Sequence, residues 1–206
     1  MIEAVKITKA YHHEAVVSDF NLKIEKGDFV AITGESGKGK TTILNILGLL
    51  EKPDFGEVIV EGEVNLNCKA MMMAQRHKFG YLFQNYALIE NESVAANLKI
   101  ALEYRKGVDQ KSAMKEALYF VNLNSAMLEK KIYQLSGGEQ QRVAIARLFL
   151  KEADYVFADE PTGNLDLKNR DVVFDLLKKL NDMGKAVVYV THDLELAARA
   201  DRWVKL

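Results

Sequence analysis

The sequence predicts an α/β fold: a core with a mixed sheet flanked by helices, an antiparallel β flank at the N-terminus and an inserted α-helical subdomain. Continuous apolar runs indicate strands covered on both faces, and helical spacing of apolar residues separates these runs. The stretch from residue 85 to 131 has no strong strand signal and reads as mostly helical. We therefore expect one domain, with a core of residues 1–84 and 151–206 and a helical subdomain of about 85–150.

The expected elements follow from these patterns in chain order. Residues 2–8 and 20–24 alternate apolar and polar side chains, as half-buried antiparallel strands do. We expect buried strands at three apolar runs: FVAIT at 29–33, YVFA at 155–158 and AVVYVT at 186–191. We expect helices at residues 41–50, about 110–121, 139–150 and 167–183, the last of them stopped by Gly184.

Composition limits the classes of function. Lys and Arg number 28 against 29 for Asp and Glu, so no global basic field points to a nucleic-acid partner. The single cysteine, Cys68, cannot form an intramolecular disulfide, which fits a reducing compartment such as the cytoplasm. The N-terminus lacks the apolar core of a signal peptide, and no window approaches the roughly 18 apolar residues of a membrane span. We therefore expect any membrane contact to go through a partner.

The segment GESGKGKT, residues 34–41, matches G-x-x-x-x-G-K-[ST] between a buried strand and a helix, the context that this phosphate-binding loop needs. Its glycines let backbone N–H groups curl around phosphates, and the helix N-terminus adds positive potential. By register, Lys40 reaches the β and γ phosphates and Thr41 supplies a ligand to Mg²⁺. Lys38 lies within the loop, and we expect its side chain to point away into solvent. The core is thus predicted to be that of a P-loop NTPase.

The strand YVFADE, residues 155–160, ends in two carboxylates. A carboxylate at the end of a strand beside a phosphate loop is placed to hold Mg²⁺, and we assign this role to Asp159. Glu160 is suited to accept a proton from a water that attacks the γ-phosphate. The alternative is a pair of solvated carboxylates at a strand end.

With the motif LSGGEQQRVAIAR, residues 135–147, the sequence resembles the ATP-binding cassette (ABC) ATPases. Ser136 and Glu139 have the spacing of a capping box, so Ser136, Gly137 and Gly138 open a helix with free N–H groups. This is a second phosphate-binding surface. The resemblance implies that it lies far from the loop of the same chain, so that two copies arranged head to tail share each ATP.

The resemblance covers the whole chain and assigns further roles. Tyr11 occupies the place of the aromatic residue that stacks on adenine, although a packing role at a strand end is the alternative. Gln84 matches the glutamine that senses γ-phosphate and Mg²⁺ at the hinge to the helical subdomain. Asn164, Leu165 and Asp166 match the loop that crosses the dimer interface, and His192 matches the histidine that contacts the γ-phosphate. The other histidines, His12, His13 and His77, are expected at the surface.

The expected site comprises three sets of residues. The catalytic residues are Lys40, Gln84, Glu160 and His192, and the Mg²⁺ ligands are Thr41, Gln84 and Asp159. The residues expected to bind the ATP are Tyr11, Gly34, Glu35, Ser36, Gly37, Lys38, Gly39, Lys40, Thr41, Thr42, Ser136, Gly137, Gly138, Glu139 and Asp166. The three consecutive methionines, Met71 to Met73, are expected to fill core space.

PTGNLD together with QQRVAIAR resembles the branch with lipoprotein-release, macrolide-export and cell-division cassettes, which act on membrane partners. FQNYALIENESVAANL, residues 83–98, resembles more narrowly the Gram-positive bacteriocin exporters of the lactococcin 972 type. This implies an ATPase subunit at the inner face of the membrane that powers export through a separate permease. Two alternatives stay open: a cassette that transmits force to a membrane partner without transport, and a soluble ABC protein that acts on DNA or ribosomes.

Overall fold

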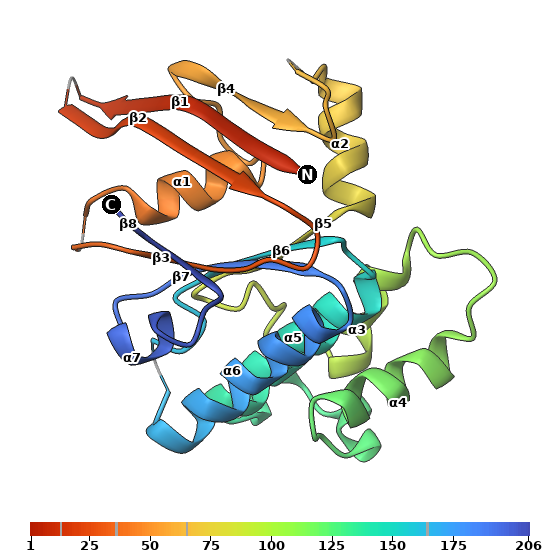
Figure 1. Cartoon of the computed structure of the whole chain (residues 1–206). Coiled ribbons are helices and arrows are strands. Elements are labelled where there is room, and N and C mark those ends of the chain that lie inside the picture. Colours follow the sequence, from red (N-terminus) through yellow and green to blue (C-terminus); the bar gives the residue numbers. More distant parts are fainter. Residues whose placement is uncertain (13, 36, 65, 164) are drawn as a thin grey trace.

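The structure is a computed structural model, and it describes residues 1–12, 14–35, 37–64, 66–163 and 165–206. Two sheets form within these ranges (Figure 1). One is antiparallel with the order β2-β1-β4, and the other is parallel with the order β5-β6-β7-β3-β8. The strands are β1 (Ile2–Tyr11), β2 (Glu14–Ile24), β3 (Phe29–Thr33), β4 (Phe55–Val60), β5 (Phe79–Leu82), β6 (Tyr155–Asp159), β7 (Ala186–Val190) and β8 (Arg202–Lys205).

The helices connect these strands and start at favourable caps. They are α1 (Lys40–Leu47), α2 (Cys68–His77), α3 (Val94–Leu102), α4 (Gln110–Phe120), α5 (Gly137–Lys151), α6 (Leu167–Asp182) and α7 (Leu194–Ala197), with two short 3₁₀ helices at Ser125–Glu129 and Ile132–Gln134. From α2 onward each α-helix begins at a side chain that accepts hydrogen bonds from the first turn: Asn67, Ser93, Asp109, Ser136, Asp166 and Asp193. No helix in the described ranges is long and apolar enough to span a bilayer.

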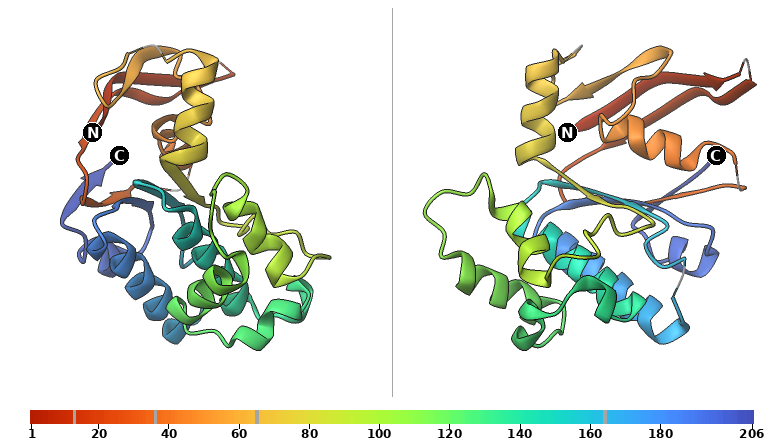
Figure 2. Two further views of the ribbon diagram at one scale, coloured as in Figure 1. Left: turned by 90° about the vertical axis from the view of Figure 1, so that its right-hand side faces the viewer. Right: turned by 180° about the vertical axis from the view of Figure 1, so that it is seen from behind.

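The two faces of the parallel sheet bury separate apolar clusters. In β3, Phe29 and Ala31 face one cluster, and Val30 and Ile32 face the other, because successive side chains of a strand point to opposite faces. The first cluster is covered by α5 and α6 with α3 and α4 beside them. The second lies under α1 and the antiparallel sheet (Figures 1 and 2). The sheet is therefore sandwiched, as the continuous apolar runs predict.

The α/β class and the antiparallel N-terminal flank are confirmed, and the two kinds of strand belong to separate sheets. The expected helices at 41–50, 110–121, 139–150 and 167–183 appear as α1, α4, α5 and α6. The sequence patterns did not locate β4, β5, β8, α2 and α7. The methionine expectation was wrong in part, because Met71 packs against the core while Met72 and Met73 are 40% and 45% exposed on α2.

Parallel pairing places the functional segments at one edge of the sheet. Ile32 of β3 and Asp159 of β6 both pair with Val190 of β7, so these strands end at the same level. The loop of residues 34–39 follows β3, Gln84 follows β5, and His192 follows β7. Segments far apart in the sequence thus meet where the strands end, which is the usual position of ligand sites in such sheets.

Candidate active site

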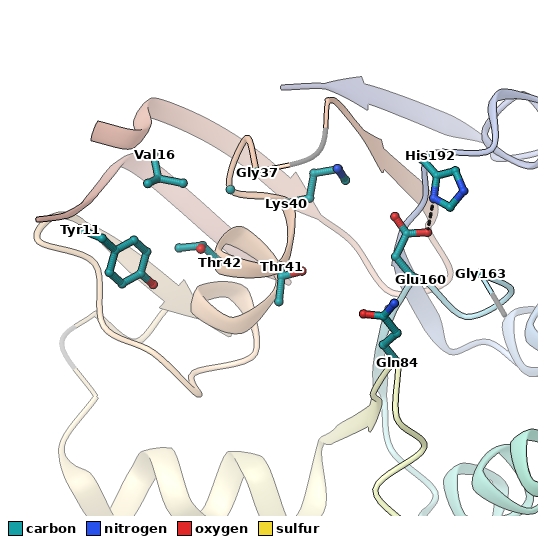
Figure 3. A pocket seen from close by; sticks show the side chains of 11 residues that line it. Tyr11, Val16, Gly37, Lys40, Thr41, Thr42, Gln84, Glu160, Gly163 and His192 are labelled. Atoms are coloured by element: carbon teal, nitrogen blue, oxygen red, sulfur yellow. Dashed lines mark hydrogen bonds and ion pairs between the residues drawn. The ribbon is translucent and has the colours of Figure 1, made fainter. Parts of the chain in front are cut away.

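A cavity of about 630 Å³ opens at this edge of the parallel sheet (Figure 3). Its volume lies within the range of small-molecule sites. It is lined by Tyr11, Val16, Gly37, Gly39, Lys40, Thr41, Thr42, Gln84, Glu160, Gly163 and His192. All of these except Val16 and Gly163 are expected from the sequence. Val16 is a valine in a strand without any motif, whereas Gly163 belongs to the segment EPTGNLD and was within reach of sequence reasoning.

The loop before α1 surrounds the side chain of Lys40 with backbone groups. Lys40 is 9% exposed, and its Nζ donates hydrogen bonds to the carbonyl oxygens of Gly34 and Glu35 at 3.0 and 2.9 Å. Gly39 has a φ of 81°, and a Cβ there would lie 2.8 Å from the carbonyl oxygen of Val16. Only glycine fits that position without strain. The lysine is therefore fixed at the cavity wall, where phosphate oxygens can replace the loop carbonyls as its acceptors.

Lys38 lies elsewhere. It is exposed and lines a second cavity, which it shares with residues of β2 and β8 and with Leu206. Its backbone N–H donates to the carbonyl oxygen of Glu35 at 3.3 Å. The side chain thus points away from the first cavity, as expected, and can contribute to a ligand there only through the backbone. Ser36, also expected in the loop, lies outside the described residues.

Thr41 and Asp159 form the part of the site that suits a magnesium ion. Thr41 Oγ1 donates to Asp159 Oδ1 at 3.1 Å, which joins α1 to the end of β6. Burial raises the pKa of Asp159, while the hydrogen bond from Thr41 opposes the rise. A hydroxyl, a carboxylate and the amide oxygen of Gln84 nearby are hard oxygen donors, and Mg²⁺ takes few protein ligands when a nucleotide supplies the others. The residues present therefore fit the ion.

Glu160 and His192 form a side-chain pair within hydrogen-bond distance in the site. His192 Nδ1 lies 2.9 Å from Glu160 Oε2 (Figure 3). Glu160 has a φ of 43°, in the left-handed region that costs a non-glycine residue of order 1 kcal/mol or more. Its backbone N–H is held by the carbonyl oxygen of Val190 at 3.1 Å. This conformation keeps the carboxylate at the cavity rather than along the strand.

Tyr11 stands at the far wall of the cavity in Figure 3. Its ring is 40% exposed, and its hydroxyl donates to the carboxylate of Glu51. Lys9 Nζ lies 5.6 Å from the ring centroid. The exposed ring is therefore anchored at one end and presents a face to the cavity, as a residue that stacks on a base requires.

The turn of residues 136–139 does not line this cavity. Ser136 and Glu139 form the predicted capping box: Ser136 Oγ accepts from the N–H of Glu139 at 3.3 Å, and Glu139 Oε2 accepts from the N–H of Ser136 at 2.8 Å. The hydrogen bonds from Ser136 lower the pKa of Glu139. The N–H groups of Gly137 and Gly138 in the first turn have no partner within the helix. The start of α5 therefore offers N–H donors of the kind that suit an anion, apart from the first cavity.

Asp166 caps the start of α6, next to the α5 turn through its contact with Asn169. Its carboxylate accepts from the N–H of Asn169 at 2.9 Å and from the side-chain amide of Asn169 at 2.7 Å, and the first of these bonds contributes most to lowering the pKa of Asp166. A Cβ on Gly138 would lie 2.8 Å from Asn169 Oδ1, so the two helix starts touch. Asp166, like the α5 turn, lies outside the lining of the cavity. Asn164 of the same predicted loop is not among the described residues.

Comparisons with known proteins identify the family of this chain. The family model described as ABC transporter matches residues 17–163. The macrolide export ATP-binding/permease protein MacB 2 of Yersinia pestis is 41% identical over 198 residues, which cover 93% of this chain and 29% of that protein. The lipoprotein-releasing system ATP-binding protein LolD of Aquifex aeolicus is 39% identical over 210 residues, which cover 100% of this chain and 93% of that protein.

A solved dimeric structure of the cassette MJ0796, bound to ADP and Pi in a post-hydrolysis state, has a TM-score of 0.90 and 36% identity. The match covers 100% of this chain and 94% of that chain, and a protein of the same designation comes from Methanocaldococcus jannaschii. The chain belongs to the ABC transporter family and is an ATPase cassette of that family. The predicted family and enzyme class are thereby confirmed.

The different positions of the two lysines predict different effects of their removal. Lys40→Ala should abolish ATP binding, because it removes the only lysine side chain among the described residues that lines the cavity. Lys38→Ala should leave the affinity for ATP within a few-fold, because its side chain faces the second cavity. Titration of both variants with a fluorescent ATP analogue measures this. Equal loss of binding in both variants would show that the assignment of the phosphate lysine is wrong.

Proposed function

We propose that this chain binds and hydrolyses ATP as a head-to-tail pair of copies and thereby drives a separate integral membrane subunit. One observation supports this most. A single cavity gathers Lys40, Thr41, Gln84, Glu160 and His192, while the second phosphate surface at 136–139 lies outside it. A second copy is the simplest source of the missing surface, because a two-fold pair would give both copies the same composite site. The dimeric MJ0796 structures support such a pair.

The proposed chemistry assigns a task to each residue of the cavity. Lys40 exchanges the carbonyls of Gly34 and Glu35 for β and γ phosphate oxygens, which keeps its charge paired throughout. Thr41, Asp159 and Gln84 would hold Mg²⁺, which, when bound, neutralises charge on the β and γ phosphates.

Glu160 accepts the proton of the attacking water. His192 uses Nδ1 toward Glu160, so its other ring nitrogen is left for the γ-phosphate.

The membrane subunit is proposed to bind a groove of about 510 Å³ beside Gln84. Its lining includes Met72, Tyr81 and Phe83 of the core and Ile100 and Tyr104 of the helical subdomain. Ile100 and Tyr104 are 47% and 48% exposed, which is high for large apolar side chains. Such a groove fits the apolar face of a short helix. Because Gln84 directly follows Phe83, which lines the groove, a shift of Gln84 with the γ-phosphate would also move the groove lining.

Location is proposed from relatives, and cargo from one stretch of the sequence. The chain spans 29% of the length of the Yersinia pestis protein MacB 2, whose name includes a permease, and 93% of the length of LolD. We place the chain in the cytoplasm, at the inner face of the membrane through its partner. Export of a bacteriocin or other peptide is proposed from the resemblance of residues 83–98 alone. The match to transporter cassettes is the reason to prefer transport over a force-transmitting or a nucleic-acid function.

Removal of the proposed base should stall the cycle in its closed state. We expect Glu160→Gln to bind ATP normally and to hydrolyse it at least about 10²-fold more slowly, the usual contribution of a general base. This variant should elute as a dimer on size exclusion only with ATP. Adding Ser136→Arg should return it to a monomer, because the bulky cation blocks the second phosphate surface.

Two results would contradict this account. A Glu160→Gln protein that stays monomeric at saturating ATP and Mg²⁺ would count against the shared sites, and wild-type turnover would count against Glu160 as the base.

Cysteine cross-linking tests the docking groove. The native Cys68 is exposed and is first replaced by Ser. Ala87→Cys, at an exposed position of the groove, should then cross-link to cytoplasmic loops of the membrane subunit in isolated membranes. Ser18→Cys, an exposed position on β2, is the matched control and should not. Cross-links from position 18 without any from position 87 would show that the docking face is wrong.

A further inference from the structure

The first turn of α6 joins the two halves of the site. Asn169 and Arg170 are neighbours in this turn, and their side chains extend to different elements. Neither residue lines the cavity, and no motif singled them out. Their contacts nevertheless connect the turn that would meet the partner's ATP with the segment that carries His192.

Asn169 contacts the α5 turn. Its Oδ1 accepts from Arg142 Nη1 of α5 at 3.1 Å, and its amide donates to Asp166 at 2.7 Å. Gly138 leaves no room for a side chain beside it, since a Cβ would lie 2.8 Å from Asn169 Oδ1. A displacement of the α5 turn therefore pushes directly on the start of α6.

Arg170 contacts the segment after β7. Its Nη1 donates to Asp193 Oδ2 at 2.8 Å, and Asp193 directly follows His192. The other oxygen of Asp193 accepts from the N–H groups of Glu195 and Leu196 and so caps α7. Arg170 and Asp193 have only 20% and 22% of their side chains exposed, so this pair is less screened than a surface pair.

A second arginine offers a contrast. Arg199, just beyond α7, pairs with Asp171 and Asp175 of α6 at 3.2 and 3.0 Å. It therefore links the same two segments, but its side chain is 43% exposed and its partners are more so. Surface pairs of this kind contribute little. The firm connection between α6 and the histidine segment is that of Arg170.

We propose that Asn169 and Arg170 are positioning residues that couple the α5 turn to His192. When ATP of the partner binds at 136–139, Asn169 fixes the start of α6. Arg170 then holds Asp193, and with it His192, in the position from which it meets Glu160. The proposal rests on the shared-site function above and adds to it a connection between the two ATP sites of the pair. A physical connection of this kind needs a coupling measurement to establish it.

Steady-state ATP hydrolysis tests the proposed contact between Arg170 and Asp193. Arg170→Met keeps the volume and removes the charge, and kcat should fall about tenfold, at the lower end for an outer-shell partner, while KM for ATP changes less than about twofold. Arg170→Lys should recover kcat to within about threefold of the wild type, because the charge on Asp193 is again paired. Arg199→Met is the matched control, and its kcat should stay within about twofold.

A second variant distinguishes the loss of the Arg170–Asp193 pair from a loss of folding. Asp193→Asn breaks the same pair from the other side but keeps the oxygen that caps α7, and it should reproduce the fall in kcat. If Arg170→Met and Asp193→Asn both keep wild-type kcat, or if Arg199→Met falls as far as Arg170→Met, the proposed link is wrong. Glu160→Gln is measured in parallel. Slow hydrolysis by Glu160→Gln beside normal Arg170→Met rejects the link alone, whereas normal Glu160→Gln rejects the proposed base.

A double-mutant cycle tests whether Asn169 and Arg170 act as one coupled unit. Asn169→Ala should also lower kcat about tenfold. Combined with Arg170→Met it should lower kcat by little more than either change alone, because either change already breaks the coupling between the α5 turn and His192. Multiplication of the two effects to about a hundredfold would show that the residues act independently and would overturn the coupling.

Discussion

The ammonium of Lys40 is buried in its own loop and is held by the carbonyl oxygens of Gly34 and Glu35. A charge in this position must always have an acceptor, because burial without one is costly. The loop carbonyls are the acceptors in this structure, and phosphate oxygens are the acceptors in the proposed complex with ATP. The rest of the site depends on this exchange. Parallel pairing of β3, β6 and β7 brings Asp159, Glu160 and His192 to the same edge, where they can act on the phosphate that Lys40 holds.

We infer a second anion-binding surface at the start of α5, which does not line the cavity of Lys40. The capping box of Ser136 and Glu139 organises the start of α5, and the neighbouring start of α6 packs against it through Asn169. An ATP that needs both surfaces must therefore lie between two copies. In this arrangement the nucleotide is part of the interface, so its hydrolysis weakens the contact between copies. In the proposed coupling, Asn169 and Arg170 of one copy transmit the binding of the partner's ATP to His192 of the same copy.

The sequence predicted those features whose cause is local. The phosphate loop, the capping box and the buried strands each depend on neighbouring residues, so their motifs predict both the element and its role. The edge strands β4, β5 and β8 were missed, because short strands are specified by their pairing partners as much as by their own pattern. Met72 and Met73 were assigned to the core because methionine most often fills core space, and residue type alone does not show which face of α2 packs. The contacts of Arg170 with Asp193 join residues brought together only by the fold.

The central claim is that each ATP is held by two copies, and a mixing experiment tests it most directly. Lys40→Ala leaves the α5 turn intact, and Ser136→Arg leaves the phosphate loop intact. Each protein alone should lack a complete site and hydrolyse almost no ATP. Their mixture should hydrolyse ATP, because the loop of one copy then meets the α5 turn of the other. Hydrolysis by the mixture no faster than by the two proteins measured separately would contradict the account.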